Sequence, residues 1–211
     1  MIDILGSLDD KIENNERLSL ELQNYCIKKF DVMFSNDELC PLSDIANITM
    51  GQSPNGNSYN ESGNGMIFFQ GRTDFGFRYP SIRLYTTEPK RMAKKGDILL
   101  SVRAPVGDIN IAFEDCCIGR GLAAISSEIN AFIYYALLAK KQDFDIYNNA
   151  GTIFGSINKE ALSQFKVPFN NELINKFLEF AQPINDKIFM LAQETLKLNE
   201  LKQLYLKKFF G

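Results

Sequence analysis

The hydrophobic residues near the start of the chain recur at the spacing of an α-helix. No Gly or Pro interrupts residues 8–34, and the apolar residues of one heptad-like seam are Leu8, Ile12, Leu22 and Cys26. Asn15 and Ser19 fall on the same seam, where polar side chains weaken a coiled coil but fix its register. The pattern therefore predicts a long helix that pairs with one specific partner.

The end of the chain carries a second helical pattern. A 3-to-4 spacing is kept by Ile184, Ile188, Leu191, Leu198, Tyr205 and Phe209. This predicts a helix over 172–180, a break or restart at Pro183, and a long helix to about Phe210. Residues 8–12 (LDDKI) also match 184–188 (INDKI), and 27–30 (IKKF) match 206–209 (LKKF). The two end helices are therefore expected to form an antiparallel coil.

Short apolar runs in the middle of the chain end in Gly, Pro or Asp, which is typical of buried strands joined by turns. Strands are expected over 66–70, 82–86, 97–102 and 108–113, with a further apolar run over 117–125. A helix is expected over 128–147, capped by Ser126 or Ser127, and a short helix over 158–164. The predicted class is α+β: one domain with a twisted mixed β-sheet and short helices, flanked by long N- and C-terminal helices that form an antiparallel coiled coil.

Helix-breaking residues divide this pattern into three segments. Ser35, Asn36 and Asp37, followed by Pro41, end the first helix. We expect an N-terminal coiled-coil helix over 1–36, a sheet-containing domain over 37–168 and a C-terminal coiled-coil helix over 169–211.

Composition removes several kinds of chemistry. The chain of 211 residues contains no histidine, which excludes Ser/His/Asp and Cys/His catalysis and imidazole metal sites. Four cysteines show no CxxC spacing, and the adjacent Cys116 and Cys117 are expected to be inert buried thiols. No metal framework is visible. The apolar run over 131–139 is too short to span a bilayer and the N-terminus lacks a basic signal-peptide region, so we expect a cytoplasmic protein.

Charge is distributed unevenly along the chain. The net charge is −3, yet residues 72–103 hold eight Lys and Arg against three Asp and Glu. A local basic field suits a polyanion site on one face, although a solvated charged surface would give the same pattern.

A set of motifs along nearly the whole chain resembles one protein family. The motifs are the helix over 7–13, the run GDILLSVRAPVG over 96–107, GRGLAA over 119–124, GTIFGSI over 151–157, KVP over 166–168 and the lysine-tipped terminal helix. In this order they resemble the DNA specificity (S) subunit of type I restriction-modification systems. The resemblance implies a non-catalytic, sequence-specific DNA-binding protein.

The resemblance also implies partners. Such subunits usually carry two target-recognition domains separated by helices and dock methyltransferase (M) subunits, which bind S-adenosylmethionine. This chain resembles half of such a subunit, with its recognition domain over 37–168, and would read one DNA half-site. A bipartite target would then require self-association or a second specificity chain. No cofactor is expected in this chain, and restriction (R) subunits with nuclease-translocase activity are a further potential partner.

Candidate contact residues follow from the chemistry of reading duplex DNA. Cations fix the phosphates, while amides, hydroxyls and arginines reach base edges. The candidates are Gln52, Ser53, Asn55, Asn57, Gln70, Arg72, Thr73, Arg103, Arg120, Thr152, Ser156 and Lys159. The alternatives are turn-forming Asn and Ser, arginines that bond turn carbonyls, and helix caps at Ser156 and Asn158. Candidate partner-binding residues on the end helices are Leu20, Ile27, Leu201 and Leu204.

Other functions fit less well. Asp74, Glu88 and Lys90 mimic the carboxylates and lysine of a metal-dependent nuclease, but Pro89 would disrupt the strand expected there. Gly51 and Gly56 have the spacing of a phosphate-binding loop, but Asn57 stands where its lysine belongs. A methyltransferase would need an Asn/Asp-Pro-Pro-aromatic run that the chain lacks. A coiled-coil scaffold that binds only protein stays open.

Overall fold

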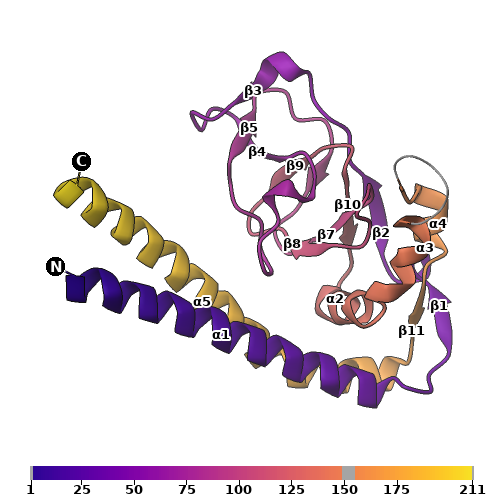
Figure 1. Cartoon of the computed structure of the whole chain (residues 1–211). Helices are drawn as coiled ribbons and strands as arrows, with labels where there is room; N and C mark the ends of the chain where they lie inside the picture. Colours follow the sequence, from indigo (N-terminus) through magenta and orange to yellow (C-terminus); the bar gives the residue numbers. More distant parts are fainter. Residues whose placement is uncertain (1, 149–154, 211) are drawn as a thin grey trace. The chain divides into compact units, whose positions relative to one another are not determined.

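The computed structural model describes residues 2–148 and 155–210, and it divides the chain into two units. One unit contains the chain up to Ser35 and from Asn171 onward, and the other is Asn36–Asn170. Figure 1 shows long helices in the first unit and strands with short helices in the second. The α+β class with long helices at both ends is confirmed.

The first unit is a pair of helices, α1 (Ile2–Met33) and α5 (Asn171–Phe210), that lie side by side and antiparallel (Figure 1). Tyr25 packs against Phe180 with ring centroids 5.4 Å apart, and Phe30 packs against Phe177 at 5.3 Å. Toward the chain ends Lys202 donates to Asp9, so early residues of α1 meet late residues of α5. The expected antiparallel pair is therefore confirmed.

The polar seam residue Asn15 is buried in this pair. Only 3% of it is exposed, and its amide donates to Glu194 Oε2 at 2.9 Å and to Thr195 Oγ1 at 3.4 Å. A buried amide needs its partners in place, so sliding one helix past the other would cost these bonds.

The expected break at Pro183 is wrong, because α5 runs continuously through this residue. Proline removes one backbone donor and frees one carbonyl of the preceding turn. Pro183 is on the exposed face, where water can bond such a carbonyl, while Ala181 and Ile188 on either side are buried. Packing of the flanking turns therefore holds the helix together.

The second unit contains three sheets. An antiparallel sheet has the order β2 (Asn47–Met50), β10 (Leu122–Ser126), β7 (Ile98–Ser101), β8 (Ile109–Ile111). A mixed sheet has the order β3 (Tyr59–Asn60), β5 (Leu84–Thr86), β4 (Met66–Phe69), β9 (Cys116–Ile118), β6 (Met92–Ala93), in which β4 and β9 are parallel. β1 (Leu39–Pro41) pairs with β11 (Lys166–Pro168). The four strands expected over 66–113 are confirmed, and the strands divide among separate sheets.

The core of this unit lies on the central strands. All of β7 is buried, as are the first four residues of β10. One cluster consists of Phe69, Ala93, Leu99, Ala112, Cys116, Ile118, Leu122 and Ala124. Cys116 and Cys117 are free buried thiols, as expected, and burial raises the pKa of Cys116 to about 12. The Cys116 thiol is therefore not activated.

The helices of this unit are shorter than the sequence predicts. Instead of one helix over 128–147, the structure has α2 (Asn130–Ala139), the 3₁₀ turn η4 (Lys141–Phe144) and α3 (Asp145–Asn148). The chain turns at η4 because Phe144 is fully buried and stacks on Phe165, with centroids 4.3 Å apart. Further short elements are η1 (Leu42–Asp44), η2 (Gly56–Ser58), η3 (Arg72–Asp74) and α4 (Lys159–Ser163).

The predicted cap of this helix is only partly right. Ser127 Oγ accepts from the Ile129 amide at 3.3 Å and donates to the Ile45 carbonyl at 2.6 Å, while the helix itself begins at Asn130. Ser127 thus ties the approach to the helix to the chain before β2. Among the residues the structure describes, no helix is long and apolar enough to cross a membrane.

Candidate nucleic-acid interface

The ends of four strands meet around the turn between β9 and β10, residues 119–121. Backbone hydrogen bonds join these segments: Gly51 N to Leu122 O, Gln52 N to Ile118 O, Gly121 N to Gln70 O, and Val102 N to Gly121 O. Residues that follow β2, β4, β7 and β9 are thereby neighbours, although they are far apart in the sequence. This brings Gln52, Gln70, Arg103 and Arg120 to one edge of the unit, and all four are exposed.

Glycines permit this close approach of backbones. A Cβ on Gly51 would lie 2.1 Å from the Gly119 carbonyl oxygen, and one on Gly119 would lie 2.9 Å from Gln70 backbone atoms. A Cβ on Gly121 would lie 2.8 Å from the Gln70 carbonyl oxygen. Such distances are too short for any side chain, so glycine at these positions sets the spacing of the loops.

The loop after β2 is held by its own polar groups. Ser53 Oγ accepts from the Arg120 amide at 3.3 Å, and Asn55 Oδ1 accepts from the Asn57 amide at 3.4 Å. Tyr59 donates to the Pro54 carbonyl at 3.0 Å. Ser53 and Asn55 therefore have structural roles here, as the turn-forming alternative requires. The side chains of Gln52 and Asn57 form no hydrogen bond with another described residue. DNA contact by any of them stays a prediction.

The segment after β4 is a closed loop, residues 71–81. Asn110, which is 2% exposed, accepts from the Gly76 amide at 3.1 Å and donates to the Gly76 carbonyl at 3.0 Å. Ser81 N donates to the Asp74 carbonyl at 2.8 Å and closes the loop. Gln70, Arg72 and Thr73 are exposed on this supported segment.

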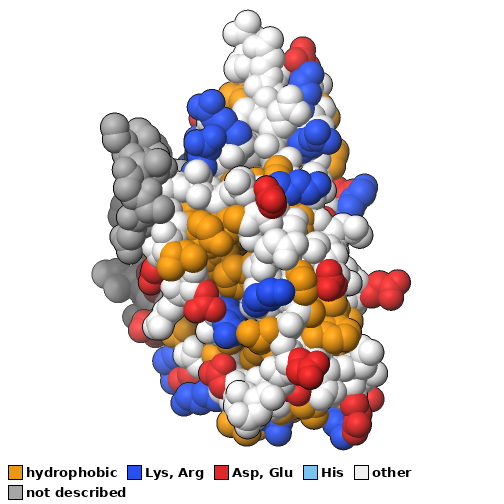
Figure 2. Space-filling view, turned by 90° about the vertical axis from the view of Figure 1, so that its right-hand side faces the viewer, with side chains coloured by type: hydrophobic (Ala, Val, Ile, Leu, Met, Phe, Trp, Pro, Cys, Tyr) orange, Lys and Arg blue, Asp and Glu red, His pale blue; other side chains and the backbone are white. Residues whose placement is uncertain are grey.

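Several cations of the basic stretch over 72–103 are buried or ion-paired, so fewer of them are open to a ligand than the composition implies. Arg78 is 3% exposed, lies 4.5 Å from the ring centroid of Tyr134, and donates to the Tyr135 hydroxyl at 3.3 Å. Carboxylates hold three other cations, in the pairs Arg72–Asp108 (2.7 Å), Arg83–Asp74 (3.1 Å) and Lys94–Asp115 (2.7 Å). On the face drawn in Figure 2, basic, acidic and apolar side chains are interspersed.

Two candidate arginines differ from these. Arg103 and Arg120 are exposed, and neither has a carboxylate within 4.0 Å among residues 2–148 and 155–210. Free guanidinium groups can donate to guanine edges or to phosphates.

Ser156 reaches the interface from the end of the unit, and Lys159 follows three residues later in the chain. Ser156 forms an isolated bridge with Arg103, and Ala104 N donates to the Gly155 carbonyl at 2.9 Å. Asn158 caps α4 by accepting from the Ala161 amide at 2.8 Å, which leaves Lys159 exposed on its first turn. Thr152 lies outside the described residues.

The nuclease arrangement finds no support in this geometry. Asp74 is 5% exposed and its carboxylate bonds Arg83, whereas Glu88 and Lys90 lie exposed between β5 and β6. In the described part of the chain, no three His, Cys, Asp or Glu residues group in a way that could hold a metal ion.

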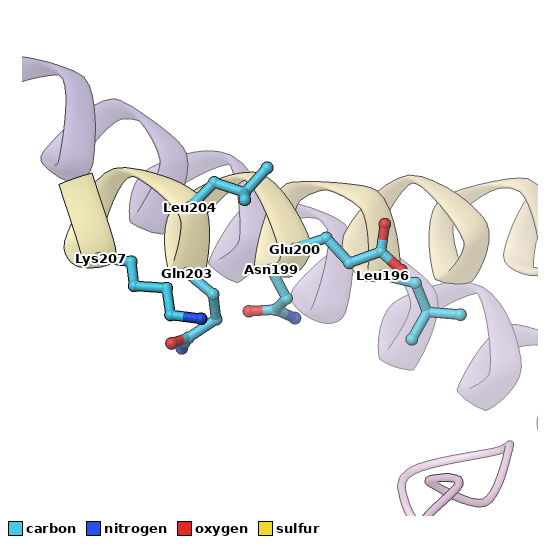
Figure 3. A pocket seen from close by; sticks show the side chains of 6 residues that line it. All are labelled: Leu196, Asn199, Glu200, Gln203, Leu204 and Lys207. Atoms are coloured by element: carbon cyan, nitrogen blue, oxygen red, sulfur yellow. The ribbon is translucent and has the colours of Figure 1, made fainter. Parts of the chain in front are cut away.

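Three of the four predicted partner-binding residues are exposed on the helical pair. Leu20 is 46% exposed, Leu201 40% and Leu204 66%, while Ile27 is half-buried. A depression on α5 is lined by Leu196, Asn199, Glu200, Gln203, Leu204 and Lys207 (Figure 3). In Figure 3, Leu204 points away from Gln203 and Lys207.

Lys141 is a candidate that sequence analysis missed. It lies in a segment expected to be plain helix, yet its ammonium bonds Asp108 at 2.9 Å beside Arg72. Only the fold could reveal this neighbour, because the contact joins residues 33 positions apart.

Comparison with known proteins gives one consistent family. The family described as "Type I restriction modification DNA specificity domain" matches residues 36–179. A Methanocaldococcus jannaschii protein named as the specificity subunit of type I restriction enzyme MjaX is 46% identical over 125 residues, which are 57% of this chain and 29% of that protein.

Solved structures match over nearly the whole chain. The HsdS subunit from Thermoanaerobacter tengcongensis is 28% identical with a TM-score of 0.63, and the match covers 98% of this chain and 56% of that one. The S subunit of a type I restriction-modification system from M. genitalium is 19% identical with a TM-score of 0.68, covering 99% and 57%, and shows likeness of fold alone. The chain thus spans little more than half the length of these solved relatives.

Proposed function

The chain belongs to the type I restriction modification DNA specificity domain family, and we propose that it reads a half-site of double-stranded DNA without catalysing a reaction itself. The observation that carries this proposal is the convergence of four strand ends on residues 119–121. At this edge lie exposed amides and two arginines that have no carboxylate partner among the described residues, and these groups have the chemistry that base reading needs.

The proposal divides the contacts by chemistry. Gln52, Gln70 and Asn57 carry amides suited to adenine, and Arg103 and Arg120 carry guanidinium groups suited to guanine. The remaining candidates would position the duplex through phosphates or shape the loops. These candidates are Ser53, Asn55, Arg72, Thr73, Thr152, Ser156 and Lys159.

We further propose that the helical pair fastens this reader to methyltransferase subunits, which would carry S-adenosylmethionine. Exposed Leu20, Leu201 and Leu204, with half-buried Ile27, are apolar positions beyond the α1–α5 seam. Restriction subunits would join the same assembly. Because one recognition unit reads one half-site, a bipartite target would need a second copy or another specificity chain.

A titration of duplex DNA tests this function. The full chain is mixed with fluorescent duplex at two salt concentrations, with and without its methyltransferase partner. We expect weak, salt-sensitive binding by the chain alone and tighter, sequence-selective binding with the partner.

The same titration separates the other functions. Cleavage of DNA by the purified chain with Mg²⁺ alone would instead favour a nuclease. Assembly with the partner, but with equal DNA affinity whether or not the chain is present, would favour a protein-only scaffold. Leu204→Asn and Leu201→Asn should weaken partner assembly while leaving the chain's own DNA affinity unchanged.

A further inference from the structure

One carboxylate of the second unit is shared by two cations from different elements. Asp108 Oδ2 lies 2.7 Å from Arg72 Nε, and Asp108 Oδ1 lies 2.9 Å from Lys141 Nζ. Arg72 begins η3, Asp108 closes the turn between β7 and β8, and Lys141 begins η4. Two cations that each take a separate oxygen of one anion are arranged as they would be around two oxygens of a phosphate.

The turn that carries Asp108 is firmly held. The hydroxyl of buried Ser101 accepts from the Asp108 amide at 2.9 Å and donates to the Pro105 carbonyl at 2.8 Å. Gly107 has φ +96°, and a Cβ there would lie 2.7–2.9 Å from atoms of the Phe144 side chain. The turn and η4 are therefore packed directly against each other. This packing fixes the backbone position of Lys141, the first residue of η4.

The third element is equally supported. Phe75 N donates to the Arg72 carbonyl at 2.9 Å, and the Asp74 carboxylate two residues later is buried and bonded by Arg83 at 3.1 Å. These bonds fix the backbone position from which the Arg72 side chain extends. The three charged groups meet because hydrogen bonds and packing hold the backbone of each supporting element in place.

The pairs themselves are open to exchange. The Arg72 and Lys141 side chains are 46% and 55% exposed, and Asp108 is 24% exposed. Ion pairs this exposed contribute little free energy because water screens them. A phosphate that approaches the two cations can therefore replace the carboxylate at small cost.

We propose that Arg72 and Lys141 form a clamp for a phosphodiester of duplex DNA, and that Asp108 fills this clamp in the free protein as an internal counter-ion. This deepens the proposed function and rests on it for the identity of the anion. The clamp borders the candidate interface, since Arg72 follows Gln70 by two residues and Asp108 shares its turn with Arg103. It assigns Arg72 to phosphate and adds Lys141 to the contact residues.

Neutralising Asp108 is the main test. Asp108→Asn keeps the backbone amide that bonds Ser101 but removes the competing charge. We expect DNA affinity, measured by fluorescence anisotropy at low salt, to rise by roughly 3- to 10-fold, equally for unrelated sequences. Lys141→Gln should weaken binding uniformly and lower the magnitude of the salt slope by about 1.

Two controls separate the clamp from a general effect of net charge: a second carboxylate variant, and Asp108→Asn combined with loss of both cations. Asp115→Asn removes one negative charge from the pair Lys94–Asp115, also 2.7 Å long, and should leave DNA affinity unchanged. The gain from Asp108→Asn should vanish when Arg72→Gln and Lys141→Gln are also present. A gain of equal size in that background would overturn the clamp, because it would come from the general field.

Inorganic phosphate separates failure of the clamp from failure of the function. NMR of the full chain follows the Arg72 Nε–Hε signal during a phosphate titration, and Asp108→Asn should shift it at several-fold lower phosphate. If wild type binds DNA but Asp108→Asn changes neither measurement, the clamp is wrong and the DNA function stands. If the clamp responds to phosphate but no variant binds DNA, the clamp stands and the proposed function falls.

Discussion

At the scale of single residues, identity matters most where backbones touch. Gly51, Gly119 and Gly121 carry no side chain that could contact DNA, yet they decide how closely three loops approach. The local sequence pattern predicts only that these glycines lie in turns. Their role depends on which strand end lies opposite, and that neighbour is distant in the chain.

Gly51→Ala should destabilise the protein by about 1–3 kcal/mol or more, because the added Cβ would lie 2.1 Å from the Gly119 carbonyl oxygen. Gly71→Ala is the control: φ there is −172°, which any residue adopts, and nothing lies within 4 Å of the added Cβ. That variant should stay within about 0.5 kcal/mol of wild type in chemical denaturation. Equal effects of the two substitutions would contradict the close-approach argument.

Arg103 and Arg72 should differ in what they read. Arg103→Ala should cost about 1–3 kcal/mol of DNA binding and relax preference at one base pair, because we assign its guanidinium, which has no carboxylate partner among the described residues, to a base edge. Arg72→Ala should weaken binding about equally for all sequences, because its cation is assigned to a phosphate. Competition binding with single-base-pair variants of the target measures both. Loss of preference on Arg72→Ala alone would reverse the assignment.

At the scale of elements, the end helices followed their pattern closely. A heptad seam is a local property, so periodicity alone located α1 and the greater part of α5. The break predicted at Pro183 is wrong because the low helix propensity of proline is outweighed by the packing of the flanking turns. Very short elements such as β3, β6 and η4 went unseen, since two to four residues contain no period.

Asn15 should set the register of the helical pair. Asn15→Leu removes a buried amide bonded to Glu194 and Thr195 and adds apolar burial. We expect the free energy of unfolding to rise by up to about 2 kcal/mol, while the chain gains alternative associated states. Thermal unfolding and sedimentation measure the two effects. A more stable variant that keeps one defined state would show that Asn15 does not specify the pairing.

The same bond makes the helical pair sensitive to acid. The Asn15 amide and the Lys11 ammonium hold the pKa of Glu194 below its ordinary value. Since the folded-state pKa is the lower one, the stabilisation is present above the unfolded-state pKa of about 4.3 and is lost as pH falls through the folded value. Asn15→Ala should raise the Glu194 pKa in an NMR titration. Glu194→Gln should flatten the fall of stability with acid; an unchanged slope would exclude this contribution.

At the scale of the whole molecule, the candidate interface has few unpaired cations among the described residues, and the chain as a whole is acidic. The formal charge is −3, and ion pairs occupy Arg72, Arg83 and Lys94 while Arg78 is buried. The local excess of cations over 72–103 therefore overstated the available field. If the proposed function holds, binding to DNA should be selective rather than strong.

This charge distribution sets the salt dependence. With two to four phosphate contacts, the logarithm of the DNA binding constant should fall against the logarithm of salt concentration with a slope of about −2 to −4. Anisotropy titrations of the full chain at several salt concentrations give the slope. A slope near zero would contradict phosphate contact, and a slope several times steeper would reveal a basic surface elsewhere.

The sequence by itself determined the end helices, the main strands and the family, because periodicity and ordered motifs depend on residues close together in the chain. It also identified Gln52, Gln70, Arg103 and Arg120, which lie exposed near the β9–β10 turn. Only the tertiary structure decided which strand ends converge and which cations are free. Arg72, Asp108 and Lys141 meet through three separate elements, and Arg78 is buried against tyrosines of α2. Charge pairing and close backbone approach depend on neighbours supplied by folding, which no local pattern encodes.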